Sequence, residues 1–105
     1  MTVTNKEIAA GFVAAKQYLW DGVEESPRNK STYICYALKI ACDKKAISVK
    51  VQIACALIIS SRLDDSFTLT TWLRARGIFV EDMPIALMQK HRHAWLDLLI
   101  KEFSE

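Results

Sequence analysis

The periodicity of residues 82–103 constrains the fold of this chain more than any other feature. Apolar and aromatic side chains recur there every three or four residues, at Pro84, Met88, His91, Trp95, Leu98 or Leu99, and Phe103. Neither Gly nor a second Pro interrupts the stretch. Such spacing puts these side chains on one face of an α-helix. We therefore expect a long amphipathic helix over these residues.

The composition extends this expectation to the whole chain. Of 105 residues, 51% are hydrophobic, whereas only three are Gly and two are Pro. This composition excludes disorder and argues against a β protein rich in loops. A chain of this length suits one hydrophobic core, and no internal repeat is visible. We expect an all-α fold, namely a compact single-domain bundle of about five helices over residues 1–105.

Start and stop signals define the first predicted helix. Thr4 precedes Glu7 by three residues, so each side chain can accept a hydrogen bond from the other residue's backbone N–H in a capping box. The helix is predicted over residues 5–20 and ends at Gly22, which can adopt the left-handed conformation of a helix end. The polar residues 23–30 then predict a connecting loop.

The second and third predicted helices are apolar around most of their circumference. The second begins near Ser31 and ends around residues 43–45, and the third follows Ser48, a suitable cap. In the third, one side carries Val49, Ile53, Ala56 and Leu57, and the next carries Val51, Cys55 and Ile58. A helix that is hydrophobic all round is usually buried. We therefore expect these two helices to form the middle of the bundle, covered by the others.

Two further helices complete the prediction. Thr68 can cap a short helix that stops at Gly77. Asp82 can cap the final helix, with Pro84 in its first turn, where a missing N–H does no harm. The aromatic wedges expected between helices are Trp72 and Trp95.

No group of residues predicts catalysis or a bound cofactor. His91 and His93 would stand about 200° apart around a helix, so they cannot hold one metal ion together. The glycines at 11, 22 and 77 are isolated, so there is no phosphate-binding loop. Neither histidine has an evident nucleophile beside it. We expect a protein that is not an enzyme and that uses no metal or cofactor.

The cysteines and the apolar runs bear on the compartment. Cys35, Cys42 and Cys55 are odd in number and stand among Ile, Ala and Leu, which favours buried thiols in a reducing compartment. The longest apolar run, residues 53–59, is too short to span a bilayer. We expect a cytoplasmic protein without a membrane segment.

One stretch suggests nucleic-acid binding. Residues 62–77 have the rhythm of a helix-turn-helix unit, although the break between the helices is longer than usual. The residues that would contact bases or phosphates are Arg62, Thr68, Thr70, Thr71, Arg74 and Arg76. The formal net charge of +2 neither demands nor excludes such a partner. A DNA-binding module centred on these residues is our alternative hypothesis.

Three blocks carry a resemblance to known proteins: YLWDG at residues 18–22, KSTYICYAL at 30–38 and HRHAWL at 91–96. The chain resembles small proteins of tailed bacteriophages and prophages to which no activity is assigned. That resemblance spans most of the chain. It implies an accessory protein that binds and redirects a host protein, for example by inhibiting a component of host defence. It carries over no functional residue.

The leading hypothesis is therefore a small phage-type accessory protein that binds a bacterial host protein in the host cytoplasm and modulates or inhibits it. Exposed aromatic and basic side chains are the preferred contacts in such interfaces. The predicted partner-binding residues are Tyr18, Trp20, Tyr36, Lys90, Arg92 and His93. A homodimer formed through the C-terminal helix is a further possibility.

Overall fold

The described part of the chain is helical, as the composition predicts. This computed structural model describes residues 2–23, 25, 28–64, 73–77 and 83–104. Its helices are α1 (Asn5–Tyr18), α2 (Ile34–Asp43), α3 (Val49–Asp64) and α5 (Ile85–Ser104). These are four of the five helices that we expected. Most of the remaining one, including its cap Thr68 and the expected wedge Trp72, lies outside the described residues.

Helix α1 begins with the predicted capping box. The backbone N–H of Glu7 donates to Oγ1 of Thr4 at 3.2 Å, and the backbone N–H of Thr4 donates to Oε1 of Glu7 at 3.2 Å. These bonds satisfy backbone donors that a helix end leaves without an intrahelical partner. The start of the first helix is therefore confirmed.

The end of α1 differs from the prediction. The helix stops at Tyr18, because Leu19 is extended and forms a parallel bridge with Ser31. The N–H of Trp20 donates to the Ser31 carbonyl at 2.7 Å, and the N–H of Ser31 donates to the Tyr18 carbonyl at 2.9 Å. Gly22 is left-handed, with φ of 82°, but it lies in the following loop and does not cap the helix. A tertiary contact with a distant residue thus ends the helix two residues early.

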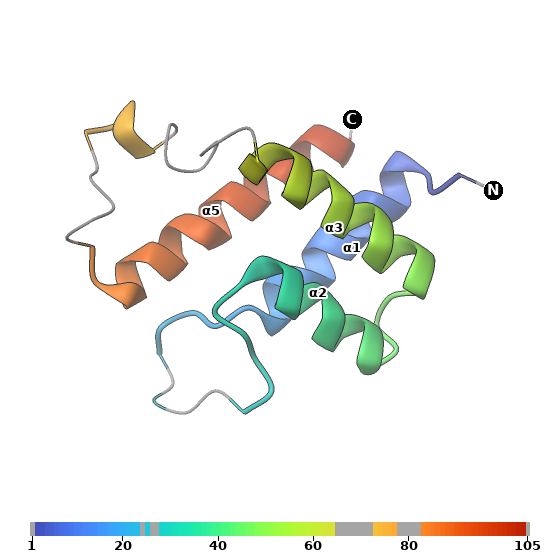
Figure 1. Cartoon of the computed structure of the whole chain (residues 1–105), viewed down its shortest axis with the longest axis horizontal. Helices are drawn as coiled ribbons and strands as arrows, with labels where there is room; N and C mark the ends of the chain where they lie inside the picture. Colours follow the sequence, from blue (N-terminus) through green and yellow to red (C-terminus); the bar gives the residue numbers. More distant parts are fainter. Residues whose placement is uncertain (1, 24, 26–27, 65–72, 78–82, 105) are drawn as a thin grey trace.

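Helix α1 occupies the middle of the molecule, where we had expected α2 and α3. It packs against all three other helices, and in Figure 1 α3 crosses in front of it. Gly11 allows the close approach, because a Cβ there would lie 2.6 Å from Sγ of Cys55 and 2.7 Å from Cγ1 of Val51, both on α3. The largest fully buried side chains come from every helix: Phe12, Leu19, Leu38, Cys55, Ile59, Leu73, Gln89, Leu96 and Leu99.

The boundaries of α2 depend on local backbone bonds. The helix begins at Ile34, three residues later than expected, and Oγ of Ser31 accepts a bond from the N–H of Tyr33 just before it. It ends in a Schellman motif, in which Ala46 N–H donates to Ala41 O and Lys45 N–H donates to Cys42 O. Lys45 adopts the left-handed conformation of this motif, with φ of 63°. A lysine stands where glycine is common.

The ends of α3 and α5 follow the sequence closely. Oγ of Ser48 accepts a bond from the N–H of Val51 at 3.2 Å, as expected of a cap. Pro84 directly precedes α5, whereas we expected it in the first turn, and its carbonyl accepts a bond from Met88 N–H. Asp82, the predicted cap, lies outside the described residues. Trp95 is buried between helices, as expected. In the described part of the chain, no helix has both the length and the apolar character to cross a membrane.

Candidate partner-binding surface

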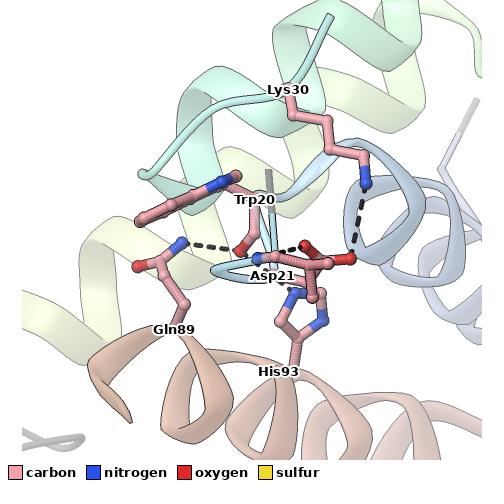
Figure 2. Close-up of polar contacts among 6 residues, drawn as sticks. Trp20, Asp21, Lys30, Gln89 and His93 are labelled. Carbon is pink, nitrogen blue, oxygen red and sulfur yellow. Dashed lines mark hydrogen bonds and ion pairs between the residues drawn. The ribbon is translucent and has the colours of Figure 1, made fainter. Parts of the chain in front are cut away.

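Three polar side chains on α5 hold the segment that connects α1 to α2. Nε2 of Gln89 donates to the carbonyl oxygen of Trp20 at 2.9 Å, and Nε2 of His93 lies 3.2 Å from the same oxygen (Figure 2). Nη1 of Arg92 donates to the carbonyl oxygen of Thr32 at 3.0 Å. A carbonyl only accepts, so His93 carries its proton on Nε2 in this contact. We call Gln89, Arg92 and His93 the α5 clamp.

The clamp is a polar network centred on the buried amide of Gln89. Gln89 is fully buried, and its Oε1 accepts a bond from Nη1 of Arg92. No buried side-chain nitrogen or oxygen of the described residues lacks a hydrogen-bond partner. Satisfied networks of this kind fix one arrangement of the groups that they join, since an unpaired buried polar group is costly. The clamp therefore fixes both ends of the connecting segment against α5.

The loop between the clamped carbonyls has its own bonds. Oδ1 of Asp21 accepts a bond from the N–H of Val23 at 3.1 Å, and Oδ2 lies 3.4 Å from Nζ of Lys30 (Figure 2). The Val23 N–H, and then the charge of Lys30, lower the pKa of the Asp21 carboxyl. Gly22 comes close to α5, because a Cβ there would lie 3.0 Å from Ala86. Glycine thus serves both the left-handed backbone and the close approach.

Arg92 links the clamp to an exposed aromatic ring. Its guanidinium carbon lies 5.4 Å from the centre of the Tyr33 ring, within range of a cation–π contact. Burial lowers the pKa of Arg92, but the guanidinium remains protonated because its ordinary pKa is so high. A fixed positive charge therefore lies beneath the Tyr33 ring.

Tyr33 and Tyr36 form an exposed aromatic pair beside this charge. The ring centres are 6.4 Å apart and the planes meet at 56°, a favourable tilted arrangement. Tyr33 is 59% exposed and Tyr36 is 61% exposed, which is unusual for side chains of this size. We call Tyr33, Tyr36 and Arg92 the tyrosine surface.

The structure divides the six predicted partner-binding residues into three groups. Tyr36 and Lys90 are exposed, as expected. Arg92 and His93 are half-buried in the clamp, so the expectation that they lie on the exposed side of the last helix is wrong. The half-buried aromatic residues are Tyr18, which packs against the core, and Trp20, whose carbonyl the clamp binds.

Sequence reasoning missed Tyr33 and Gln89. Tyr33 is not among the predicted partner-binding residues, although its spacing of three residues from Tyr36 is a signal for a shared helical face. Gln89 carried no signal, because a glutamine on a helix is most often solvated. Only the position of the loop carbonyls against α5 explains its burial.

Of the residues of the nucleic-acid hypothesis, the structure describes Arg62, Arg74 and Arg76. The guanidinium of Arg62 donates to the Glu102 carboxylate and also lies 5.8 Å from the centre of the Phe103 ring. Its charge is therefore partly neutralised. Arg74 and Arg76 are exposed around a turn that ends at Gly77. The predicted contacts Thr68, Thr70 and Thr71 lie outside the described residues.

The histidines and cysteines form no cluster that could hold a metal ion among the described residues. All three cysteines are free thiols, but only Cys55 is fully buried, whereas Cys35 and Cys42 are half-buried. Burial raises the pKa of the Cys55 thiol to about 12, and it also raises that of Cys35. A thiol with a raised pKa is a poor nucleophile at neutral pH.

The chain was compared with protein-family models, curated proteins and solved structures. No protein-family model, no curated protein and no solved structure matches the chain.

Proposed function

We propose that this protein is a small phage-type accessory protein that binds a bacterial host protein through the tyrosine surface and modulates or inhibits it. The observation that carries the proposal is the exposed Tyr33–Tyr36 pair beside the guanidinium of Arg92. Tyr and Arg are among the residues most enriched at the energetic centres of protein interfaces. The resemblance of residues 18–22, 30–38 and 91–96 to phage proteins supports a host protein as the partner.

The fixed geometry of this surface supports the proposal further. Arg92 is held by Thr32 and Gln89, and Tyr33 directly precedes the first residue of α2. A binding surface whose side chains are already ordered loses less conformational entropy when the complex forms. Tyrosine also supplies a large contact area with few rotatable bonds. The α5 clamp therefore acts as a positioning device for the surface.

Affinity capture from bacterial lysate tests the proposal. The tagged chain and its Tyr33→Ala, Tyr36→Ala variant are compared, with Val13→Ala as the matched control because Val13 on α1 is 53% exposed. We expect one host protein to be retained by the unaltered chain and by Val13→Ala, and to fall by about tenfold or more with the tyrosine variant. Circular dichroism of each variant controls for folding.

Three outcomes contradict the proposal. The host protein is retained equally by the tyrosine variant, or it disappears after nuclease treatment, or no host protein is retained. The second outcome favours the nucleic-acid hypothesis, which also predicts a binding constant that falls steeply with added salt. If a host protein is retained, its activity with and without the purified chain shows whether binding modulates or inhibits it.

Self-association through α5 is tested with the same preparations. Leu98 on α5 remains 46% exposed, although much of the helix packs into the core. If α5 pairs with its own copy, the molar mass from light scattering rises with concentration, and Leu98→Gln abolishes the rise.

A further inference from the structure

The outward side of α3 carries a row of apolar residues, contrary to the expectation that this helix is buried all round. Val49, Ile53 and Leu57 are 60%, 50% and 65% exposed. The residues buried on the opposite side of the same helix are Val51, Cys55 and Ile59. A helix at the surface of a protein normally carries polar side chains on its solvent side. The three exposed residues, which we call the α3 ridge, break this rule.

The α3 ridge has the shape of a helix-packing surface. Its members are four residues apart, so they lie in one row along the helix, about 12 Å from the first to the last. Rows with this spacing are the ridges that enter the groove of a second helix in most helix pairs. Ser60 and Ser61 are exposed beyond the row and are small. No large polar side chain stands within the row to obstruct a second helix.

Basic residues outnumber acidic ones around the start of α3. Residues 44–63 contain four basic residues and no acidic residue. Three of the four, Lys44, Lys45 and Lys50, are exposed near the start of α3. The amino-terminal end of a helix also carries a partial positive charge. Asp43 is the nearest preceding carboxylate, so the net charge of residues 43–50 is three lysines minus one aspartate, or +2.

We propose that the α3 ridge binds an amphipathic helix of a partner protein whose apolar face is flanked by carboxylates. The aliphatic row fits the apolar face of such a helix, and the three lysines attract the acidic side chains beside it. A second copy that docks ridge to ridge does not meet this requirement, because residues 44–63 offer no carboxylate to the lysines. A lipid surface is a poorer match, because the row contains no aromatic residue.

The α3 ridge and the tyrosine surface share no residue. The α3 ridge lies on α3. The tyrosine surface is formed by Tyr33, which directly precedes α2, by Tyr36 on α2 and by Arg92 on α5. Variants of one leave the other unchanged, so the two proposals can fail separately. A partner with an acidic helix can occupy the ridge whether or not the tyrosine surface binds a host protein.

The experiment uses two synthetic peptides of about 18 residues, labelled for fluorescence anisotropy. Both place leucine at every fourth or third position on one face. The acidic peptide carries glutamate on both flanks of that face, and the otherwise identical basic peptide, its twin, carries lysine at the same positions. We expect the acidic peptide to bind the chain at least about tenfold more tightly than the basic twin. We also expect Ile53→Gln, Leu57→Gln to weaken the acidic peptide by about tenfold, and Leu98→Gln on α5 to leave it unchanged.

Four results overturn the proposal. The first is no binding of the acidic peptide up to about 1 mM, and the second is equal affinity of the chain for both peptides. The third is equal affinity of the ridge variant and the unaltered chain for the acidic peptide. The fourth is tighter binding of anionic lipid vesicles than of the acidic peptide. Sedimentation adds a fifth. A dimer that forms with concentration and is lost in the ridge variant assigns the ridge to a second copy instead. Because both substituted side chains are half or more exposed, urea unfolding of the variant should have the same midpoint as that of the unaltered chain.

Discussion

Helix α1 makes one contact that depends on volume, and the segment after it makes another that depends on hydrogen bonds. At the crossing with α3, Gly11 faces Cys55 and Val51 so closely that a Cβ would overlap both. At the contact with α5, the polar side chains Gln89, Arg92 and His93 bond to backbone carbonyls of the connecting segment. One contact is apolar and closely packed, and the other is polar and directional.

The two contacts should therefore fail for different reasons. Close packing tolerates little added volume, because the neighbours of a buried atom cannot all move away. A buried polar contact tolerates a change of shape better than the loss of a donor, since an unpaired carbonyl is costly in the interior. The comparison also has a functional side. The first contact fixes the position of α3 and its ridge, and the second fixes the tyrosine surface.

Adding a methyl group at Gly11 should give the largest effect. Gly11→Ala should lower the free energy of unfolding by about 2 kcal/mol through overpacking, although alanine by itself favours a helix by about 1 kcal/mol over glycine. Urea unfolding followed by circular dichroism measures the difference. The matched control is Ala10→Ser, because Ala10 is exposed beside it on the same helix.

A double-mutant cycle localises the clash. Combining Gly11→Ala with Cys55→Ala removes the sulfur atom that lies 2.6 Å from the added Cβ. The pair should be less destabilising than the sum of the two single changes by about 1 kcal/mol. Strict additivity of the two changes would show that the helix crossing does not limit the volume at Gly11.

Removing the buried amide of the clamp should have the next largest effect. Gln89→Leu keeps the size of the side chain but leaves the Trp20 carbonyl with one donor fewer and deprives Arg92 of an acceptor. We expect a loss of about 1.5 kcal/mol in unfolding free energy. Lys90→Leu, at the neighbouring exposed position, should change it by less than about 0.5 kcal/mol. Equal effects at the two positions would contradict the role of the clamp.

Alkaline pH should weaken the volume-dependent contact more than the polar one. The pKa of the Cys55 thiol is raised to about 12 by burial, so the thiol stays protonated in the folded state while it ionises near pH 9 in the unfolded chain. The stabilisation from the neutral thiol is complete below about pH 9 and is lost progressively as the pH rises towards 12. At pH 10 the loss should be about 1 kcal/mol.

The measurement compares unfolding free energies at pH 8 and pH 10 for the unaltered chain and for Cys55→Ala. The alanine variant should lose about 1 kcal/mol less between the two values, because it has no buried thiol to ionise. Tyrosine and lysine also titrate in this range, so only the difference between the two proteins reports on Cys55. A pH dependence of the unfolding free energy that is the same in both proteins would show that folding does not raise the pKa of the Cys55 thiol.

The helices were largely predictable because their signals are local. The capping box of Thr4 and Glu7, the cap at Ser48 and the periodicity of residues 82–103 each depend on residues within a few positions of one another. The end of α1 was not predictable, because it depends on the bridge between Leu19 and a residue twelve positions away. A left-handed Lys45 was also not predictable, since lysine carries no preference for that conformation.

The candidate site was predictable only in part. Tyr36 and Lys90 were expected to be exposed, and they are. Arg92 and His93 were expected on the same exposed side, but both bind carbonyls of the connecting segment. The error has a physical cause. Periodicity identifies which residues share a face of a helix, but it does not show which polar face will meet a buried backbone carbonyl.

Composition and short-range spacing were enough to predict the helices of the described residues and several of their boundaries, because capping bonds and apolar periodicity act within one or two turns. Tertiary structure alone decided that α1 lies in the middle, that the α5 clamp is buried and that Val49, Ile53 and Leu57 remain exposed. An apolar side chain gains the same free energy against any apolar neighbour. Which neighbour it meets, or whether it meets none, depends on how closely the backbones can approach, and here Gly11 sets that distance at the crossing with α3.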